Sequence, residues 1–250
     1  MKAPAHRPLR AATYNVHGCV GVDGRYAPDR ISAVLGELEA DVIGLQEVDN
    51  RRPNHRGLHQ FGYLERASGF AAVAGPNIIS ERGDYGNALL TRLPVAAVRH
   101  IDLSLRGREP RGAIDVDLAG PDGPLRVVVT HFGLSPRERR AQVGMLLDAL
   151  GYAPHAEHGG EPTLLLGDLN EWLPGGGPRL TALGRRFPAH YAGRTWPAAW
   201  PLLRLDRIYA DPAPARVRIA AHRSALARRA SDHLPLIADL VWADAAVGAL

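Results

Sequence analysis

Apolar segments that end abruptly in polar residues recur along the chain, and each predicts a buried strand that delivers side chains to the edge of a sheet. The clearest case is the run at residues 163–166, which is followed by Gly167, Asp168, Leu169 and Asn170. A short continuous apolar run is typical of a strand buried on both faces. If strand geometry persists past Gly167, Asp168 and Asn170 project to the same side, although both are also ordinary turn residues.

The first part of the chain has a β-α-β pattern. Residues 9–14 predict a strand that stops at Asn15, and residues 41–47 predict a second strand that closes on Glu47. Between them, a helix is predicted by apolar residues at the spacing i, i+3, i+4 and i+7, namely Ile31, Val34, Leu35 and Leu38. Each predicted strand therefore ends on a polar side chain.

The middle of the chain favours antiparallel hairpins, because strand-like segments follow one another with short connections. These segments are residues 71–74, 86–91, 95–102, 112–118 and 125–131. The last of them ends on His131. Ser135, Pro136 and Glu138 then combine a capping box with proline at the first helical position, which predicts a helix with Val143, Leu146, Leu147 and Leu150 on its buried side.

The last part of the chain predicts three more strands. They are residues 204–209, which carry Asp206, residues 217–221, and residues 234–241, which follow Asp232 and His233. A linker long enough to separate two domains does not occur. We therefore expect residues 1–250 to form a single domain, with residues 1–8 flexible.

The composition is that of an ordinary soluble globular protein, with 46% apolar and 22% charged residues in 250. The net charge of +4 would suit an anionic partner, but Lys2 is the only lysine and the arginine bias resembles a genome-wide preference. Cys19 is the only cysteine, which excludes an internal disulfide and a multi-cysteine metal site. Without a leader-like or membrane-length apolar segment, a cytoplasmic monomer is the expectation.

The polar groups at the strand ends predict a metal-assisted chemistry. They are Asn15, Glu47, His131, Asp168, Asn170, Asp206, Asp232 and His233. Carboxylates that converge without a cysteine would repel one another unless a hard cation lay between them, and oxygen ligands suit Mg²⁺ or Mn²⁺. The two histidines add proton donors and phosphate contacts. This set is suited to metal-assisted hydrolysis of a phosphate ester.

The ordered motifs resemble those of the endonuclease/exonuclease/phosphatase superfamily, whose fold is that of deoxyribonuclease I. The matching segments are residues 13–15, 45–48, 86–91, 130–131, 167–170, 205–208 and 231–235. The opening Thr-Tyr-Asn-Val-His-Gly is similar to a bacterial subgroup. The resemblance implies an α/β (α+β) fold, a four-layer α/β/β/α sandwich of two mixed, mostly antiparallel sheets, which agrees with the hairpin-rich pattern.

The resemblance also implies a role for each strand-end residue. Glu47 would be the main metal ligand, with Asn15 and Asp232 helping to hold the ion or its waters. Asp168 would orient or deprotonate the attacking water, and Asn170 would bind phosphate. His233 would contact the scissile phosphate, with Asp206 fixing its tautomer and favouring its charged form. His131 would bind phosphate or protonate the leaving oxygen. Without the resemblance, Asp206 could be a surface residue paired with Arg204 or Arg207.

The substrate stays open at the level of the sequence. Nucleic acid is favoured by three arginine clusters, namely Arg106, Arg108 and Arg111; Arg137, Arg139 and Arg140; and Arg228 and Arg229. A phospholipid or sphingomyelin-type diester is favoured by Trp196, Trp200, Leu202 and Leu203 beside Asp206. A small phosphomonoester is a further alternative, and a binding module without catalysis is a remote one.

Overall fold

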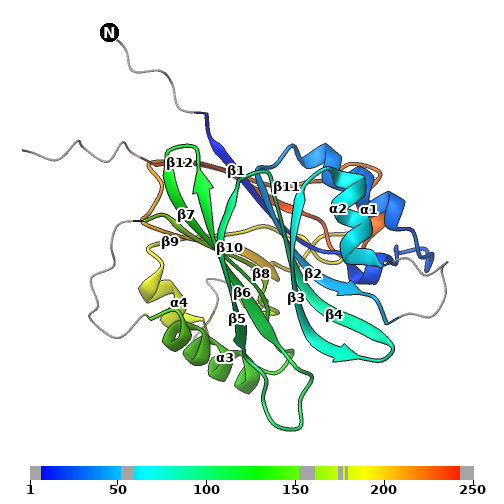
Figure 1. Ribbon diagram of the computed structural model, residues 1–250, viewed down its shortest axis with the longest axis horizontal. Coiled ribbons are helices and arrows are strands. Elements are labelled where there is room, and N and C mark those ends of the chain that lie inside the picture. Colours follow the sequence, from blue (N-terminus) through cyan, green and yellow to red (C-terminus); the bar gives the residue numbers. More distant parts are fainter. Residues whose placement is uncertain (1–6, 52–58, 152–160, 174–176, 178–179, 243–250) are drawn as a thin grey trace, which may run out of the picture.

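Two six-stranded sheets pack face to face in the computed structural model (Figure 1), which describes residues 7–51, 59–151, 161–173, 177 and 180–242. The first sheet has the order β11 (Arg216–Ala221), β12 (Leu236–Val241), β1 (Leu9–Asn15), β2 (Val42–Asp49), β4 (Gly83–Thr91) and β3 (Ala71–Ser80). The second has the order β5 (Val95–Asp102), β6 (Gly112–Gly120), β7 (Gly123–His131), β8 (Thr163–Asp168), β10 (Asp206–Asp211) and β9 (Ala189–Ala192).

Each sheet has one parallel pair at its centre. β1 pairs parallel with β2, and β7 pairs parallel with β8, while the other neighbouring strands run antiparallel. The prediction of two mixed, mostly antiparallel sheets is confirmed. The parallel strands β1, β2, β7 and β8 carry four of the predicted site residues at or near their carboxyl ends, where α/β proteins place their ligands.

Helices cover the outer face of both sheets (Figure 1). Helices α1 (Pro28–Leu38) and α2 (Gln60–Ser68) pack on the first sheet, and α3 (Pro136–Ala149) and α4 (Thr181–Arg186) pack on the second. The other helical elements in the described part of the chain are short, namely η1 (His17–Cys19) and α5 (Ala227–Ala230). The four-layer sandwich is therefore present, and none of the described helices is long and apolar enough to cross a membrane.

Three apolar cores separate the four layers, and strand alternation divides the side chains among them. On β8, Leu164 and Leu166 face the other sheet, whereas Leu165 faces α3. Gly44 on β2 lies opposite them, where a Cβ would come within 3.0 Å of the Leu166 Cβ. Glycine at this position therefore allows the two sheets to approach closely.

The structure corrects the sequence analysis in several places. β3 extends from Ala71 to Ser80, well beyond the predicted residues 71–74, and strand β9 and helix α5 were not predicted. The capping box at Ser135 is present, but Leu147 is only partly buried, and Arg139 and Gln142 are buried on α3. The prediction that residues 1–8 are flexible stays a prediction, because residues 1–6 lie outside the described part of the chain.

Candidate active site

The candidate site lies where the core between the two sheets ends in polar side chains. On β8 the residues Leu164 and Leu166 face this core, and Asp168 continues the same alternation. By the same rule, three more polar side chains lie on the face of their strand that points to this core. His131 shares a face with Val129 on β7, Asp206 with Ile208 on β10, and Asn15 with Ala11 on β1. Strand periodicity therefore brings these side chains together at one edge of the inter-sheet layer.

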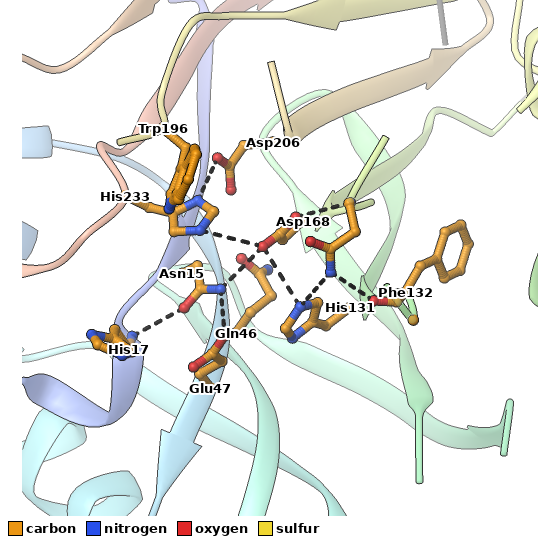
Figure 2. A network of polar contacts seen from close by, with 12 residues as sticks. Asn15, His17, Gln46, Glu47, His131, Phe132, Asp168, Trp196, Asp206 and His233 are labelled. Atoms are coloured by element: carbon orange, nitrogen blue, oxygen red, sulfur yellow. Dashed lines mark hydrogen bonds and ion pairs between the residues drawn. The ribbon is translucent and has the colours of Figure 1, made fainter. Parts of the chain in front are cut away.

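Asp168 is the centre of the polar network (Figure 2). Its Oδ2 atom accepts a hydrogen bond from Asn15 Nδ2 at 3.1 Å, and it lies 3.6 Å from both His131 Nε2 and His233 Nε2. The residue is only 1% exposed. A buried carboxylate oxygen with an amide and two imidazoles around it is suited to hold and polarise a water molecule.

Asn170 reaches the site through a turn. β8 ends at Asp168, whose Oδ1 accepts a hydrogen bond from Asn170 N at 3.0 Å, and Asn170 has a left-handed φ of 50°. Strand geometry therefore persists past Gly167 only as far as Asp168, and an Asx turn, the alternative that the sequence also allowed, places Asn170. Asn170 nevertheless enters the site, with Nδ2 3.0 Å from His131 Nε2 and donating to Phe132 O at 2.8 Å.

His233 and Asp206 form a buried pair beside Asp168. The His233 Nδ1 atom lies 2.9 Å from Asp206 Oδ2, which also accepts a hydrogen bond from Thr195 Oγ1. Burial alone would lower the pKa of His233, but Asp206 and Asp168 outweigh it and raise the pKa to about 10. The surface pairing of Asp206 with Arg204 or Arg207 is ruled out, since Asp206 is 0% exposed and the Arg207 guanidinium donates to Glu171 O.

Glu47 reaches the inter-sheet side through a β-bulge in β2. Ile43 and Leu45 face the helical layer, and so does Val48. Val48 lies three residues after Leu45, so regular alternation would have pointed it to the opposite face. The pairing with β4 shifts register between Leu45 and Val48, and Glu47 has a φ of 59°. Without this bulge, regular alternation would point Glu47 at the helices. The left-handed conformation is therefore part of how the site is built.

Asn15 joins Glu47 to Asp168. Its Nδ2 atom lies 2.9 Å from Glu47 Oε1, while its Oδ1 accepts a hydrogen bond from His17 N at 3.0 Å. Burial, opposed by the Asn15 hydrogen bond and reinforced by the charge of Asp168, raises the pKa of Glu47. In this arrangement the amide nitrogen of Asn15, and not its oxygen, faces the two carboxylates.

His131 is held by an arginine whose role the sequence analysis missed. Arg111 Nη1 lies 3.0 Å from His131 Nδ1, and both side chains are buried. Burial, and next the positive charge of Arg111, lower the pKa of His131 to about 3. A sequence signal existed, because a tight turn at residues 120–123 sets the β6–β7 register, which pairs Ala113 with Thr130 and so brings the start of β6 near His131. Arg111 was instead assigned to a surface cluster.

Asp232 lies at the exposed rim of the site, with a side chain 38% exposed. Its Oδ2 accepts a hydrogen bond from Trp196 Nε1 at 3.2 Å, and its Oδ1 lies 3.7 Å from His17 Nδ1. Among the described residues, no hydrogen bond or ion pair joins Asp232 to Glu47, so the structure brings together the other predicted residues more closely than this one.

The donor set fits a hard divalent cation. Within the described part of the chain, Asp168, Asp206 and His233 offer candidate ligand atoms within 4.8 Å of one another, but a cationic His233 has no lone pair for a metal. This group also differs from the predicted ligands, namely Glu47, Asn15 and Asp232. Glu47 and Asp168 both accept a hydrogen bond from Asn15 Nδ2, so their carboxylates lie close to each other. Burial, and to a smaller extent the charge of Asp168, raises the pKa of Glu47, and a cation would favour the ionised form of both carboxylates. Carboxylate oxygens are the ligands that Mg²⁺ and Mn²⁺ prefer.

The structure divides the predicted arginine clusters. Arg139 is 1% exposed and forms an ion pair with Glu171 at 3.3 Å, so its assignment to a phosphate-binding surface is wrong. Arg228 donates hydrogen bonds to Ala198 O and Ala199 O. Four exposed arginines remain on the β5–β6 connection and the first half of α3, and we call Arg106, Arg108, Arg137 and Arg140 the basic patch.

The sandwich and the polar end of its inter-sheet core define the class of proteins with a deoxyribonuclease I-like fold. The family model described as Endonuclease/Exonuclease/phosphatase family matches residues 12–233. The chain belongs to this family, whose members are hydrolases of phosphate esters.

Individual relatives agree with this assignment. The chain is 30% identical over 248 residues to the uncharacterized protein YbhP of Escherichia coli K12, and the matched region covers 93% of this chain and 96% of YbhP. A family member from Beutenbergia cavernae superposes with a TM-score of 0.75 and 23% identity over 96% of this chain and 73% of the other. A mannosyl-6-phosphatase from Bacteroides thetaiotaomicron superposes with a TM-score of 0.71 and 16% identity over 94% of this chain and all (100%) of the other.

Proposed function

We propose that this protein is a divalent-metal-dependent phosphoesterase that hydrolyses a phosphodiester, and that its substrate is a nucleic acid. One observation carries the reaction type: the buried Asp168 Oδ2 lies within 3.1 Å of Asn15 Nδ2 and 3.6 Å of the Nε2 atoms of His131 and His233. This arrangement places a base, hydrogen-bond donors and a cationic imidazole around one point.

Each side chain has a distinct role in this proposal. Asp168 orients the attacking water and takes its proton, since its Oδ2 lies among Asn15 Nδ2 and the Nε2 atoms of His131 and His233. The raised pKa of His233, about 10, keeps its imidazolium charged at neutral pH, so that it stabilises the negative charge that develops on the phosphate. Asp206 accepts the Nδ1–H of His233 at 2.9 Å, which fixes the ring orientation and favours the charged form. Asn170 and His131 bind phosphate oxygens.

The metal in this proposal is Mg²⁺ or Mn²⁺. Glu47 would hold it as the main ligand, with Asp232 at the rim and Asn15 helping to hold the ion or its waters through the 2.9 Å contact with Glu47. A bound cation would neutralise charge on the phosphate oxygens and lower the pKa of a coordinated water. Burial, and next the charge of Asp168, raise the pKa of Glu47, and a bound cation would oppose both effects by stabilising the ionised carboxylate.

The preference for nucleic acid rests on the basic patch. Arg106 and Arg108 lie on the connection that also carries Arg111, the residue in contact with His131. Arg108 Nε lies 3.7 Å from Glu138 Oε1 at the start of α3, which brings this connection beside Arg137. Exposed arginines next to a catalytic centre are suited to follow a phosphate backbone.

A lipid diester is the second candidate, and an exposed apolar segment favours it. Trp200 is 80% exposed and Leu202 is 65% exposed, between Trp196 at the site and Asp206. Exposed tryptophan and leucine side chains suit the interface of a membrane. A phosphomonoester is a third candidate, because the Bacteroides thetaiotaomicron mannosyl-6-phosphatase has the same fold.

One experiment separates these candidates. The purified protein, with Mg²⁺ or Mn²⁺, would be assayed in parallel on plasmid DNA, an abasic oligonucleotide, RNA, sphingomyelin, glycerophospholipids and inositol phosphates. The Asp168→Asn variant would serve as the blank. We expect release from DNA or RNA that the variant lacks. Activity confined to lipids or small phosphoesters would replace the nucleic-acid assignment, and no activity on any ester would refute the proposed function.

A further inference from the structure

The two ring nitrogens of His131 are contacted by different side chains. Arg111 Nη1 lies 3.0 Å from Nδ1, and Asn170 Nδ2 lies 3.0 Å from Nε2. A neutral imidazole has one donor and one acceptor nitrogen, and the partners decide which is which. Both neighbouring atoms are nitrogens, so the ring cannot accept from both of them.

Arg111 decides the state of Nδ1. A guanidinium has only donors, so a proton on Nδ1 would face another proton. Arg111 is 6% exposed, and its Nη2 forms an ion pair with Glu109 Oε1 at 3.1 Å, which fixes the orientation of the group. Asn170 Nδ2 is a donor too, but it is neutral, whereas the buried guanidinium is charged and makes the stronger hydrogen bond. Nδ1 is therefore the acceptor, and the single ring proton of His131 resides on Nε2.

Phe132 decides the orientation of Asn170. The Phe132 carbonyl oxygen lies 2.8 Å from the Asn170 amide atom that faces it, and a carbonyl can only accept, so that atom is Nδ2. The Asx turn at Asp168 fixes the backbone of the same residue. The Nε2–H of His131 and the Nδ2–H of Asn170 are consequently two donors that lie 3.0 Å apart.

This pair of donors needs an acceptor that can serve both. The carboxylate oxygen described beside His131 Nε2 is Asp168 Oδ2, at 3.6 Å, which is longer than a good hydrogen bond. A non-bridging phosphate oxygen has several lone pairs and a negative charge, so it can accept from both groups. The two donors thus form one half of a preorganised oxyanion site.

We propose that Arg111 is a positioning residue that holds His131 in its Nε2–H tautomer, so that His131 and Asn170 together bind one non-bridging oxygen of the substrate phosphate. The inference rests on the proposed function and deepens it. It also decides between the two roles that the sequence left open for His131. A ring whose Nδ1 must accept from Arg111 would become an imidazolate if it gave up the Nε2 proton, so His131 donates a hydrogen bond and does not protonate the leaving oxygen.

The tautomer can be measured without any substrate. Long-range proton–nitrogen correlation spectra of ¹⁵N-histidine-labelled, Mg²⁺-loaded protein distinguish a protonated from an accepting ring nitrogen. We expect an accepting Nδ1 and a protonated Nε2 for His131 in the unmodified protein. In Arg111→Met, Nδ1 becomes free to carry the proton and Nε2 can accept from Asn170, so the Nδ1–H form should appear. Arg111→Lys retains a charged donor and should restore the original tautomer.

Phosphate binding provides the second readout. We expect Arg111→Met to weaken the binding of inorganic phosphate, and to reduce kcat/KM, by at least about tenfold, the scale of one hydrogen bond to a charged group. Arg111→Lys should recover part of both. Arg218→Met, on the exposed edge strand β11, is the matched control and should change neither.

Distinct outcomes would overturn the inference and the proposed function. An Nδ1–H signal for His131 in the unmodified protein would overturn the positioning role even if the enzyme hydrolyses phosphate esters. An unchanged tautomer in a folded Arg111→Met variant would do the same. If Arg111→Met does not fold, the unmodified protein and Arg111→Lys still decide the tautomer. A lack of phosphoesterase activity in the unmodified protein would refute the proposed function, while the spectra would still report on Arg111.

Discussion

His233 Nδ1 lies 2.9 Å from Oδ2 of Asp206, a carboxylate with no exposed surface. This contact favours the charged form of His233, whereas the other histidine of the site, His131, is neutral. Asp206 and Asp168 raise the pKa of His233 to about 10 against the effect of burial, whereas burial and Arg111 lower that of His131 to about 3. One carboxylate oxygen, Asp168 Oδ2, therefore has a cationic and a neutral imidazole at 3.6 Å.

The Asp206→Asn variant should lower the pKa of His233, because it removes the carboxylate that favours the imidazolium while burial remains. A folded-state pKa raised to about 10 contributes stability that is fully present below the ordinary histidine value of about 6.5 and is lost as pH rises through about 10. NMR titration of His233 in metal-free protein would measure the shift. A His233 that titrates identically in both proteins would show that Asp206 does not set its charge.

The Asp168→Asn variant should lose turnover by at least about a hundredfold with the fold intact, the usual scale for the loss of a general base. The amide keeps the shape of the side chain and can still accept from Asn170 N, so Asx-turn geometry persists. Circular dichroism and kcat would be compared with Asp148→Asn, an exposed carboxylate on α3. Near-normal turnover of Asp168→Asn would remove this residue from the mechanism.

The Glu47→Gln variant should need at least about tenfold more Mg²⁺ for half-maximal activity, since it replaces the main anionic ligand with a neutral amide. Thermal unfolding gives a readout besides activity, because a ligand that binds only the folded state raises Tm. The Mg²⁺-dependent rise in Tm should shrink in Glu47→Gln and persist in Glu81→Gln, an exposed control. Equal Mg²⁺ responses in both variants would exclude Glu47 as the main ligand.

The convergence of polar residues at the strand ends could be predicted from strand periodicity in the sequence. Leu164, Leu166 and Asp168 follow one alternating pattern, and the same rule applies to the strands that end on His131 and Asn15. Because side chains two apart share a face, polar residues at the ends of these strands had to converge. The fold class followed from the same pattern and from the resemblance of the motifs.

Features that depend on long-range geometry were outside the reach of this pattern. Strict alternation would point Glu47 to the helices, together with Ile43 and Leu45. A bulge turns its side chain to the other face, and the hydrophobic pattern does not reveal this bulge. Arg139 looked like a surface arginine of α3 because its partner Glu171 lies 32 residues further along the chain. Ion pairs of this kind are set by tertiary packing and not by local spacing.

The Asp115→Asn variant should reduce the free energy of unfolding by about 2 kcal/mol, the scale of a hydrogen bond to a buried charged group. Asp115 on β6 is 1% exposed and accepts from Arg126 Nε at 2.8 Å and Arg99 Nε at 2.7 Å. Burial alone would raise the pKa of Asp115, but the hydrogen bonds from the two arginines outweigh it and lower the pKa. The stability they contribute is present above the ordinary carboxyl pKa of about 3.9 and is lost as pH falls through the lowered value.

Urea unfolding at pH 7 and in mild acid would test the Asp115 prediction, with Asp117→Asn as its control. Asp117 is 40% exposed and pairs with the exposed side of Arg99, so its loss should cost less than about 1 kcal/mol. Equal unfolding energies for the two variants at pH 7 would show that the buried pairing adds nothing beyond a surface ion pair.

Neutralising the basic patch should weaken nucleic-acid binding and its dependence on salt. In a variant with Arg106, Arg108, Arg137 and Arg140 changed to Gln, the slope of log K against log salt should fall by roughly 0.9 for each arginine that contacts a phosphate of duplex DNA. The matched control changes four exposed arginines away from the patch, namely Arg185, Arg216, Arg218 and Arg223. Net charge falls equally in both variants, so a specific effect must exceed that of the control. Equal slopes in the two variants would argue against binding of a DNA backbone at this surface. The double variant Trp200→Ser and Leu202→Ser, assayed on phospholipid vesicles, would then test whether the exposed apolar segment contacts the substrate.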